Sequence, residues 1–408
     1  MPCIGCDDKG KAVKKAIMYG AGNVGRGFLG QLFSESGYEV VFVDIVPELI
    51  AALNERGSYR LRLVSNERSE EVVIGHVRAV DGRAVDAVVA EIAGADLMAT
   101  AVGANVLPRI APTIAAAIAR RAAALPATPL NIIICENLKD APRLLREMLE
   151  KHLPAEHHGY LATRVGLVDA VIARMVPIVP ADLQQQDPSL ILAEPYKILP
   201  VNKAGFVGDI PSIVGMEPYD HFEAYVDRKL YIHNAGHAML GYLGHLKGLT
   251  YGYEALADPD IHPWLSRALD ESGRALIARH GFDPQALQEH VADLLARFAN
   301  RALGDTTFRL ARDPLRKLGR TDRLVGAASL AWDLSIRPVA LSLGIAAALA
   351  FDHPQDASAA ELQRRLAQEG PESVLRQVCG LDPKGELAQM ILAQYDRIRR
   401  GAFFRSVG

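Results

Sequence analysis

A lysine, an amide and an imidazole lie within one short segment, at Lys229, Asn234 and His237. If the segment is a helix, Asn234 and His237 share a face and Lys229 lies one to two turns earlier. The three groups can then serve as a base, a dipole that holds an oxygen, and an orienting group. A lysine acts as a base near neutral pH only if desolvation or a nearby positive charge lowers its pKa. From the spacing alone, a solvated helix face remains the alternative.

A glycine-rich run gives the second group of residues. It comprises Gly20, Ala21, Gly22, Asn23, Val24 and Gly25 and fits G-x-G-x-x-G. A predicted strand precedes it, a predicted helix opens inside it, and Asp44 ends the next predicted strand. This context predicts a dinucleotide site in which the helix N-terminus binds the pyrophosphate and the acid binds the ribose hydroxyls. Because Asp44 would repel a 2′-phosphate, the motif favours NAD over NADP, and Arg26 alone does not reverse that preference.

Two further turns follow predicted strands at the same edge of the sheet. The first contains Val102, Gly103 and Asn105, which we interpret either as part of the nicotinamide pocket or as a plain turn into a helix. The second contains Asn137, whose neutral amide can hold a substrate hydroxyl or carbonyl. Doubly wound folds bind their ligands at this carboxyl edge.

The elements that position these residues change character along the chain. Strand patterns at 16–19, 39–44, 96–102 and 130–135 alternate with helical patterns such as 24–35 and 110–123. They predict an α/β Rossmann-type domain with a parallel sheet that is mixed at its edge. Periodic helical patterns then follow at 229–246, 263–280, 284–302 and 359–366. We therefore predict a disordered tail over 1–14, a dinucleotide-binding domain over 15–200 and an all-α substrate domain over 201–408, with the active site in the cleft between the domains.

Composition excludes several classes of protein. The chain has 408 residues and a formal charge of −3, which predicts two domains and offers no basic field for nucleic acid. Its longest apolar run, 339–351, is shorter than the roughly 18 residues of a membrane span, so we expect a buried helix there. The four cysteines form no disulfide framework, Cys3 and Cys6 lie in the polar tail, and no apolar signal opens the chain. We expect a cytoplasmic protein without a membrane or nucleic-acid partner.

Taken together, the motifs resemble the polyol-specific long-chain dehydrogenase/reductase family. The resemblance runs collinearly from about residue 15 to 350. It rests on the glycine-rich segment with Asp44, Glu136-Asn137, the Lys-x-x-x-x-Asn-x-x-His pattern at 229–237, the triplet Glu271-Ser272-Gly273 with the pair Gly281-Phe282, and the basic segment 312–324. It implies that Lys229 is the general base, that Asn137 and Asn234 hold the reacting oxygen, and that His237 positions substrate or lysine. It also implies NAD as cofactor, no metal, and a monomer.

The same resemblance indicates a sugar-alcohol phosphate as substrate. Arg309 and Lys317 match substrate positions of the family, and Arg312 belongs to the same run of cations. Arginine binds phosphate bidentately, so this run suits a phosphorylated sugar, although a charge run is also typical of a solvated face. Ala173 stands where many relatives have Asp, which leaves the polyol open.

The reaction that the resemblance implies is reversible hydride transfer between NAD and a sugar-alcohol phosphate, with D-mannitol 1-phosphate and D-fructose 6-phosphate as the expected pair. One alternative is an NAD-dependent dehydrogenase of an unphosphorylated polyol or a sugar acid, of the mannitol 2-dehydrogenase or hexuronate reductase type. Another is a decarboxylating dehydrogenase of a sugar acid. A non-catalytic NAD(H)-sensing protein is the alternative of a different class, and it would not need Lys229, Asn234 and His237.

Overall fold

The computed structural model describes residues 13–401, so the predicted tail up to residue 12, with Cys3 and Cys6, lies outside the described residues. The chain divides into two compact units, Met1–Phe222 and Glu223–Gly408. Residues 201–222 fall in the first unit, whereas the sequence analysis places them in the second domain. They do so because strand β10 (Leu199–Asn202) pairs with strand β11 (Met216–Tyr219) and thereby ties this stretch to the first unit.

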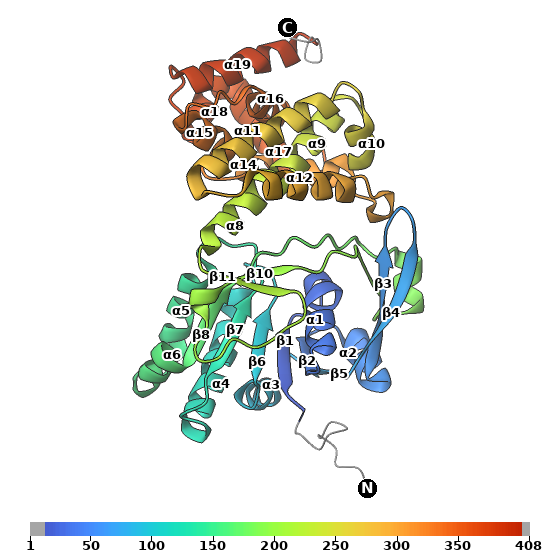
Figure 1. Ribbon diagram of the computed structural model, residues 1–408, viewed down its shortest axis with the longest axis vertical. Coiled ribbons are helices and arrows are strands. Elements are labelled where there is room, and N and C mark those ends of the chain that lie inside the picture. Colours follow the sequence, from blue (N-terminus) through green and yellow to red (C-terminus); the bar gives the residue numbers. More distant parts are fainter. Residues whose placement is uncertain (1–12, 402–408) are drawn as a thin grey trace. The chain divides into compact units, whose positions relative to one another are not determined.

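A six-stranded sheet forms the centre of the first unit (Figure 1). In spatial order its strands are β5 (Val77–Asp81), β2 (Glu39–Asp44), β1 (Lys15–Tyr19), β6 (Leu97–Thr100), β7 (Leu130–Ile134) and β8 (Val165–Asp169). All its pairings are parallel. The chain order reverses between β1 and β6, which is where a doubly wound sheet forms its ligand-binding crevice.

Apolar side chains cover both faces of this sheet. On one face, Ile17, Val41 and Ile132 pack with buried residues of helices α3, α4 and α5. On the other face, Phe42 and Tyr59 approach Gly30 at the start of helix α1. Burial on both faces explains why these strands read as continuous apolar runs. The helices of the unit are α1 (Gly30–Glu35), α2 (Pro47–Arg56), α3 (Val85–Ala93), α4 (Leu107–Ala124), α5 (Ala141–His152), α6 (His158–Arg164) and α7 (Ala181–Gln186).

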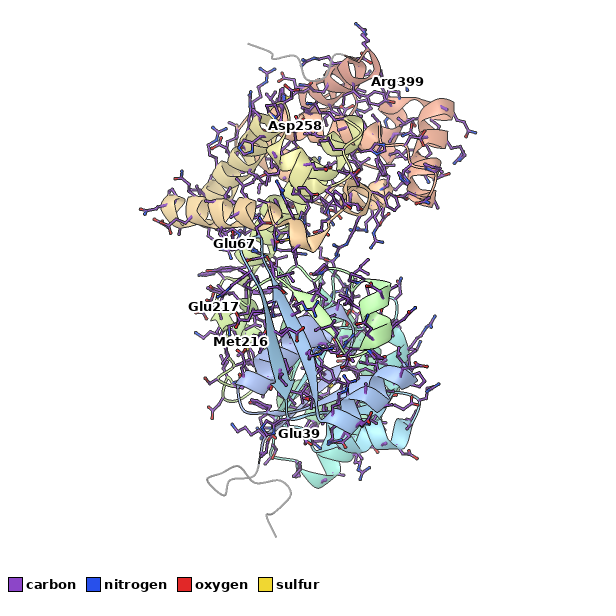
Figure 2. All side chains as sticks on the ribbon, turned by 90° about the vertical axis from the view of Figure 1, so that its right-hand side faces the viewer. Glu39, Glu67, Met216, Glu217, Asp258 and Arg399 are labelled. Carbon is purple, nitrogen blue, oxygen red and sulfur yellow. The ribbon has the colours of Figure 1, made fainter. Side chains whose placement is uncertain are left out.

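The antiparallel pairing expected at an edge of the main sheet lies in a separate sheet instead. Strands β3 (Ser58–Val64) and β4 (Ser69–Gly75) form a hairpin, and β9 (Ile191–Ala193) pairs in parallel with β3. Figure 2 shows Glu67 at the turn of this hairpin and Glu39 at the start of β2. The sequence analysis did not identify the hairpin.

The second unit is built from helices. They are α8 (Phe222–Arg228), which begins at the last residue of the first unit, α9 (Ala235–Leu246), α10 (Gly252–Ala257), α11 (His262–His280), α12 (Pro284–Phe298), α13 (Thr307–Ala311), α14 (Pro314–Lys317), α15 (Val325–Asp333), α16 (Val339–Leu349), α17 (Ala357–Glu369), α18 (Pro371–Gln377) and α19 (Glu386–Arg399). The expected buried helix is α16, in which every residue from Ala340 to Leu349 is buried. The carboxylate of Glu271 accepts the N–H groups of Ala340 and Leu341, so this residue caps the core helix. No helix within residues 13–401 has both the length and the apolar character that crossing a membrane requires.

Candidate active site

The three glycines of the glycine-rich turn differ in what surrounds them. Gly20 has a φ of +100°, and a Cβ there would lie 2.5 Å from the Ala101 carbonyl oxygen. A Cβ at Gly25 would overlap the Gly20 carbonyl oxygen. A Cβ at Gly22, in contrast, would have no protein atom within 4 Å. Packing within the protein therefore explains Gly20 and Gly25, whereas the space at Gly22 is open and no packing contact explains that glycine.

Asp44 is fixed by backbone groups on two sides. Its Oδ2 accepts the N–H of Ala21 at 2.8 Å, and its Oδ1 accepts the N–H groups of Ile45 at 2.7 Å and Val46 at 3.1 Å. A carboxylate has about four acceptor positions, two on each oxygen, so about one position remains for a further donor, on Oδ2. The carboxylate is thus held against the glycine-rich turn, with one acceptor position left on Oδ2.

Arg26 has a structural role. Its side chain is buried, and its Nε donates to the Ala21 carbonyl at 2.6 Å while its Nη1 donates to the Ser189 carbonyl at 2.6 Å. Burial lowers the pKa of Arg26. Because these donors are used within the protein, Arg26 does not present its guanidinium to a 2′-phosphate, which agrees with the preference for NAD.

The turn after β6 is fixed by a residue that the sequence analysis did not single out for this role. Glu136 is buried, and its two carboxylate oxygens accept the N–H groups of Val102 at 2.9 Å and Gly103 at 2.8 Å. The Gly103 carbonyl accepts the N–H groups of Val106 and Leu107, so the turn leads into α4. Asn105 is exposed in the same turn. The structure thus forms the turn into a helix, at the carboxyl edge where a nicotinamide would bind.

Asn137 lies at this edge too, after the end of β7, and its side chain is exposed. Asp169 ends the neighbouring strand β8, opposite Ile134 of β7. Burial, and to a lesser extent the charge of Asp140, raise the pKa of Asp169 to about 6, although the N–H of Ala170 acts in the opposite direction. The sequence analysis missed Asp169, although an acid directly after a buried apolar strand is a recognisable signal.

The lysine motif does not form a regular α-helix throughout. Residues Lys229–Asn234 form a π-helical turn, η4, which continues into α9. Five residues along an α-helix turn a side chain by about 140°, whereas i→i+5 bonding places residue i+5 close to one turn further on. The π turn therefore brings Asn234 nearer to the face of Lys229 than the α-helical spacing predicts. Single π turns of this kind are frequent at functional sites.

Desolvation and two neighbouring positive charges lower the pKa of Lys229 to about 8. Desolvation is the largest of these effects, and the positive charge of Arg323 is the second. Asp322 opposes them, and Arg316 supplies the other positive charge. These are the conditions under which a lysine can accept a proton near neutral pH, and Arg323 supplies the nearby cation from within the chain.

The basic segment contributes residues in different environments. Lys317 is buried, its Nζ donates to the Leu310 carbonyl, and desolvation lowers its pKa to about 7. Arg309 is about a third exposed and pairs with Asp305. Arg312 is exposed. Burial is the larger cause that lowers the pKa of Arg309, and the positive charge of Arg312 is the second. These two arginines therefore lie close together. The segment is therefore not uniformly a solvated face.

Arg309 and Lys317 of this segment lie near His237. Burial lowers the pKa of His237 well below its usual range, and the charges of Arg309, Lys317, Arg297 and Arg323 lower it further. The second unit thus places Arg309, Lys317 and Arg323 near His237, and Arg323 near Lys229, whereas Arg312 is not among the charges that act on His237. That Lys229, Asn234, His237, Arg309, Arg312 and Lys317 form one site stays a prediction. The predicted residues Asp44, Val102, Gly103, Asn105 and Asn137 belong to the first unit.

Ala173 is buried beside Arg174, whose side chain is also buried. The Nε of Arg174 donates to the Glu194 carbonyl at 2.8 Å, and its Nη1 donates to the Gln31 side chain at 2.7 Å. Desolvation lowers the pKa of Arg174 to about 10. The arginine of this segment therefore serves the packing of the first unit.

Comparison with known proteins gives consistent matches along the chain. Residues 14–215 match the profile of the mannitol dehydrogenase Rossmann domain, and residues 221–399 match that of the mannitol dehydrogenase C-terminal domain. A Brevibacillus brevis protein named mannitol-1-phosphate 5-dehydrogenase is 40% identical over 384 residues, which are 94% of this chain and 98% of that protein. A Bacillus licheniformis protein of the same name is 38% identical over 379 residues, 93% of this chain and 98% of the relative.

Two solved structures share the fold. The ternary complex of Pseudomonas fluorescens mannitol 2-dehydrogenase with NAD and D-mannitol has a TM-score of 0.77 and 17% identity, over 96% of this chain and 92% of that one. A substrate-free D-sorbitol dehydrogenase has a TM-score of 0.80 and 17% identity, over 96% and 95% of the two chains. At this identity the likeness concerns the fold.

Proposed function

The chain belongs to the mannitol dehydrogenase family, and we propose that it is an NAD-dependent enzyme that interconverts D-mannitol 1-phosphate and D-fructose 6-phosphate. The curated relatives that carry the name mannitol-1-phosphate 5-dehydrogenase support this substrate. The observation that carries the proposal is a lysine with a pKa of about 8 among buried cations, because it combines a base with charges that suit a phosphate. Reduction of fructose 6-phosphate with NADH tests it.

The first unit would hold the cofactor. We assign the pyrophosphate to the run Gly20 to Gly25, the ribose hydroxyls to Asp44, and the nicotinamide side to Val102, Gly103 and Asn105. The open space at Gly22 and the unused acceptor capacity of Asp44 fit these roles. When bound, NAD supplies the acceptor for the hydride of the alcohol carbon.

The second unit would carry out the proton chemistry. We assign to Lys229 the removal of the hydroxyl proton, which is possible because its amine is neutral in part of the population near pH 8. The amide of Asn234 would hold the oxygen as it becomes a carbonyl, a role that we also assign to Asn137 of the first unit, and His237 would position the substrate. Arg309, Lys317 and Arg312 would bind the phosphate.

The proposed function also extends to the oligomeric state and the cellular compartment. We propose a monomer that acts on a small molecule in the cytoplasm. The cysteines of the described region support a reducing compartment, because Cys135 and Cys379 are both buried and free.

Replacing Asp44 by alanine is expected to narrow the preference for NADH over NADPH. The carboxylate both binds ribose hydroxyls and repels a 2′-phosphate, so its removal should raise KM for NADH and lower KM for NADPH, with a smaller change in kcat. Steady-state kinetics with the two cofactors measure this preference. Glu39→Ala is the matched control, because Glu39 opens the same strand that Asp44 ends. Equal use of both cofactors by the unmutated protein would reject the role of Asp44.

The rate of polyol oxidation is expected to rise with pH through about 8. Lys229 accepts a proton only in its neutral form, and that form grows as the pH passes the pKa of the lysine. Ketose reduction needs the protonated lysine and should fall over the same range. Arg323→Gln removes a charge that lowers this pKa, so the rise should move to higher pH. Profiles of kcat/KM against pH measure both effects, and an identical midpoint in the Arg323→Gln variant would contradict the assignment.

A further inference from the structure

Three rings of the second unit form a cluster around His237. The imidazole of His237 stacks on the ring of Phe298, with centroids 4.1 Å apart and planes at 29°. The imidazole of His233 meets His237 at 4.7 Å and 85°, and meets Phe298 at 5.5 Å and 90°. His237 therefore has an aromatic ring along its face and a second imidazole near its edge, which restricts its orientation more than either contact alone.

A glycine in the backbone leaves space for this cluster of rings. Phe298 is the last residue of α12, 5% exposed, and comes from a helix distant in sequence from the lysine motif. A Cβ at Gly236 would lie 2.9 Å from Cε2 of Phe298, so the ring packs directly against the backbone beside His237. Packing therefore explains the glycine at position 236, because an alanine there would displace the Phe298 ring.

Charged groups face His237 from several elements. Arg297 lies on α12, Arg309 on α13 and Lys317 on α14, and Arg323 lies in the turn before α15. All four charges, together with burial, oppose protonation of this imidazole. The neighbouring His233 is affected in the same way, by burial first and then by His237, Arg297, Lys229 and His290. Both imidazoles are thereby kept neutral at physiological pH.

We propose that Phe298 and His233 are positioning residues, which hold the imidazole of His237 in a single orientation for a hydrogen bond with a substrate hydroxyl. A neutral imidazole has one donor and one acceptor nitrogen. A ring held in one orientation can therefore distinguish a hydroxyl group that donates a hydrogen bond from one that accepts it. The Phe298 ring excludes water from one face of the imidazole and orients it. The substrate part of this inference rests on the proposed function.

Nuclear magnetic resonance tests the ring cluster without any substrate. Histidine is labelled with 13C at Cε1, and the signal of His237 is identified by its loss in the His237→Gln variant. In the unmutated protein we expect this signal to be shifted upfield by the ring current of Phe298 and to resist titration. In Phe298→Leu it should lose that shift, and its titration midpoint should rise because water reaches the imidazole, while the four cations still hold it below its ordinary range. Phe298→Tyr should restore both properties.

A matched control exists elsewhere in the unit. Phe308 stacks on His353 with centroids 4.1 Å apart and planes at 26°, nearly the geometry of the Phe298 pair. Phe308→Leu should therefore change the signal of His353 and leave that of His237 in place. A signal and midpoint of His237 unchanged by Phe298→Leu would overturn the inference. If Phe298→Leu does not fold, Gly236→Ala displaces the same ring, and the signal and titration midpoint of His237 are measured in that variant instead.

Kinetics test whether the fixed orientation serves the substrate. Phe298→Leu should raise KM for fructose 6-phosphate about two- to tenfold, as expected for losing one aromatic contact, with a smaller change in kcat. Phe298→Tyr should retain the original KM. An unchanged KM in a variant whose His237 signal has moved would overturn the positioning role. Because the resonance measurement needs no substrate, failure of the proposed function is distinguishable from failure of this inference.

Discussion

Replacing Lys229 by alanine is expected to lower the rate of polyol oxidation by a factor on the order of 10² to 10⁴, the usual contribution of a general base. Its pKa of about 8 lets it accept the hydroxyl proton near neutral pH, and no neighbouring histidine can replace it, because burial strongly disfavours protonation of His233 and His237. NADH binding, measured by fluorescence titration, should remain nearly unchanged. Small primary amines added to the variant should restore part of the rate.

Lys247→Ala is the matched control for this prediction. Lys247 lies after the end of α9, further along the helical stretch that begins at Lys229, and its ammonium pairs with Asp258 and Asp260. Its removal should leave the rate close to that of the unmutated protein. If Lys229→Ala retained most of its turnover, Lys229 would be a surface lysine and η4 would lose its assigned role.

Neutralising Arg309 or Lys317 is expected to lower kcat/KM for fructose 6-phosphate by about ten- to a hundredfold each. A phosphate carries close to two negative charges at neutral pH, and each charge-assisted contact contributes roughly 1.5 to 3 kcal/mol. The loss should fall on the phosphorylated substrate, while the low activity with fructose should change little. Steady-state kinetics of Arg309→Gln and Lys317→Gln with both ketoses measure this difference.

A control variant in the same run of cations distinguishes phosphate binding from a general effect of positive charge. Arg320 is exposed and donates to the hydroxyl of Ser329, so Arg320→Gln removes an equal charge away from the cluster around His237. We expect this variant to keep its preference for the phosphorylated ketose. If Arg309→Gln and Lys317→Gln also kept it, the segment would be a solvated face and an unphosphorylated polyol or a sugar acid would become the better substrate.

The first unit was largely predictable because its signals are local. A strand, a glycine-rich turn and an acid ending the next strand define one continuous stretch of chain, and in the structure the Asp44 carboxylate accepts the N–H of Ala21 in that turn. The hairpin of β3 and β4 was missed because its charged, half-exposed strands lack the apolar run of a buried strand. The role of Glu136 depends on a contact with the turn after another strand, which spacing does not reveal.

The helical unit was predictable in its elements and less so in its site. The apolar run that became α16 and the lysine motif are visible in the sequence. The π turn Lys229–Asn234 is a matter of hydrogen-bond register, and residue types do not specify it. Phe298 was not identified because its contact with His237 joins positions about sixty residues apart, and no local pattern marks it.

The most direct test of the proposed function is the loss of NADH absorbance on mixing the purified protein with fructose 6-phosphate, compared with fructose at the same concentration and with NADPH in place of NADH. We predict rapid oxidation of NADH with fructose 6-phosphate, far slower oxidation with fructose, and a clear preference for NADH over NADPH. Equal rates with the two ketoses would contradict the phosphate site, and the absence of turnover with either ketose or a sugar acid would indicate a protein that binds NAD(H) without catalysis.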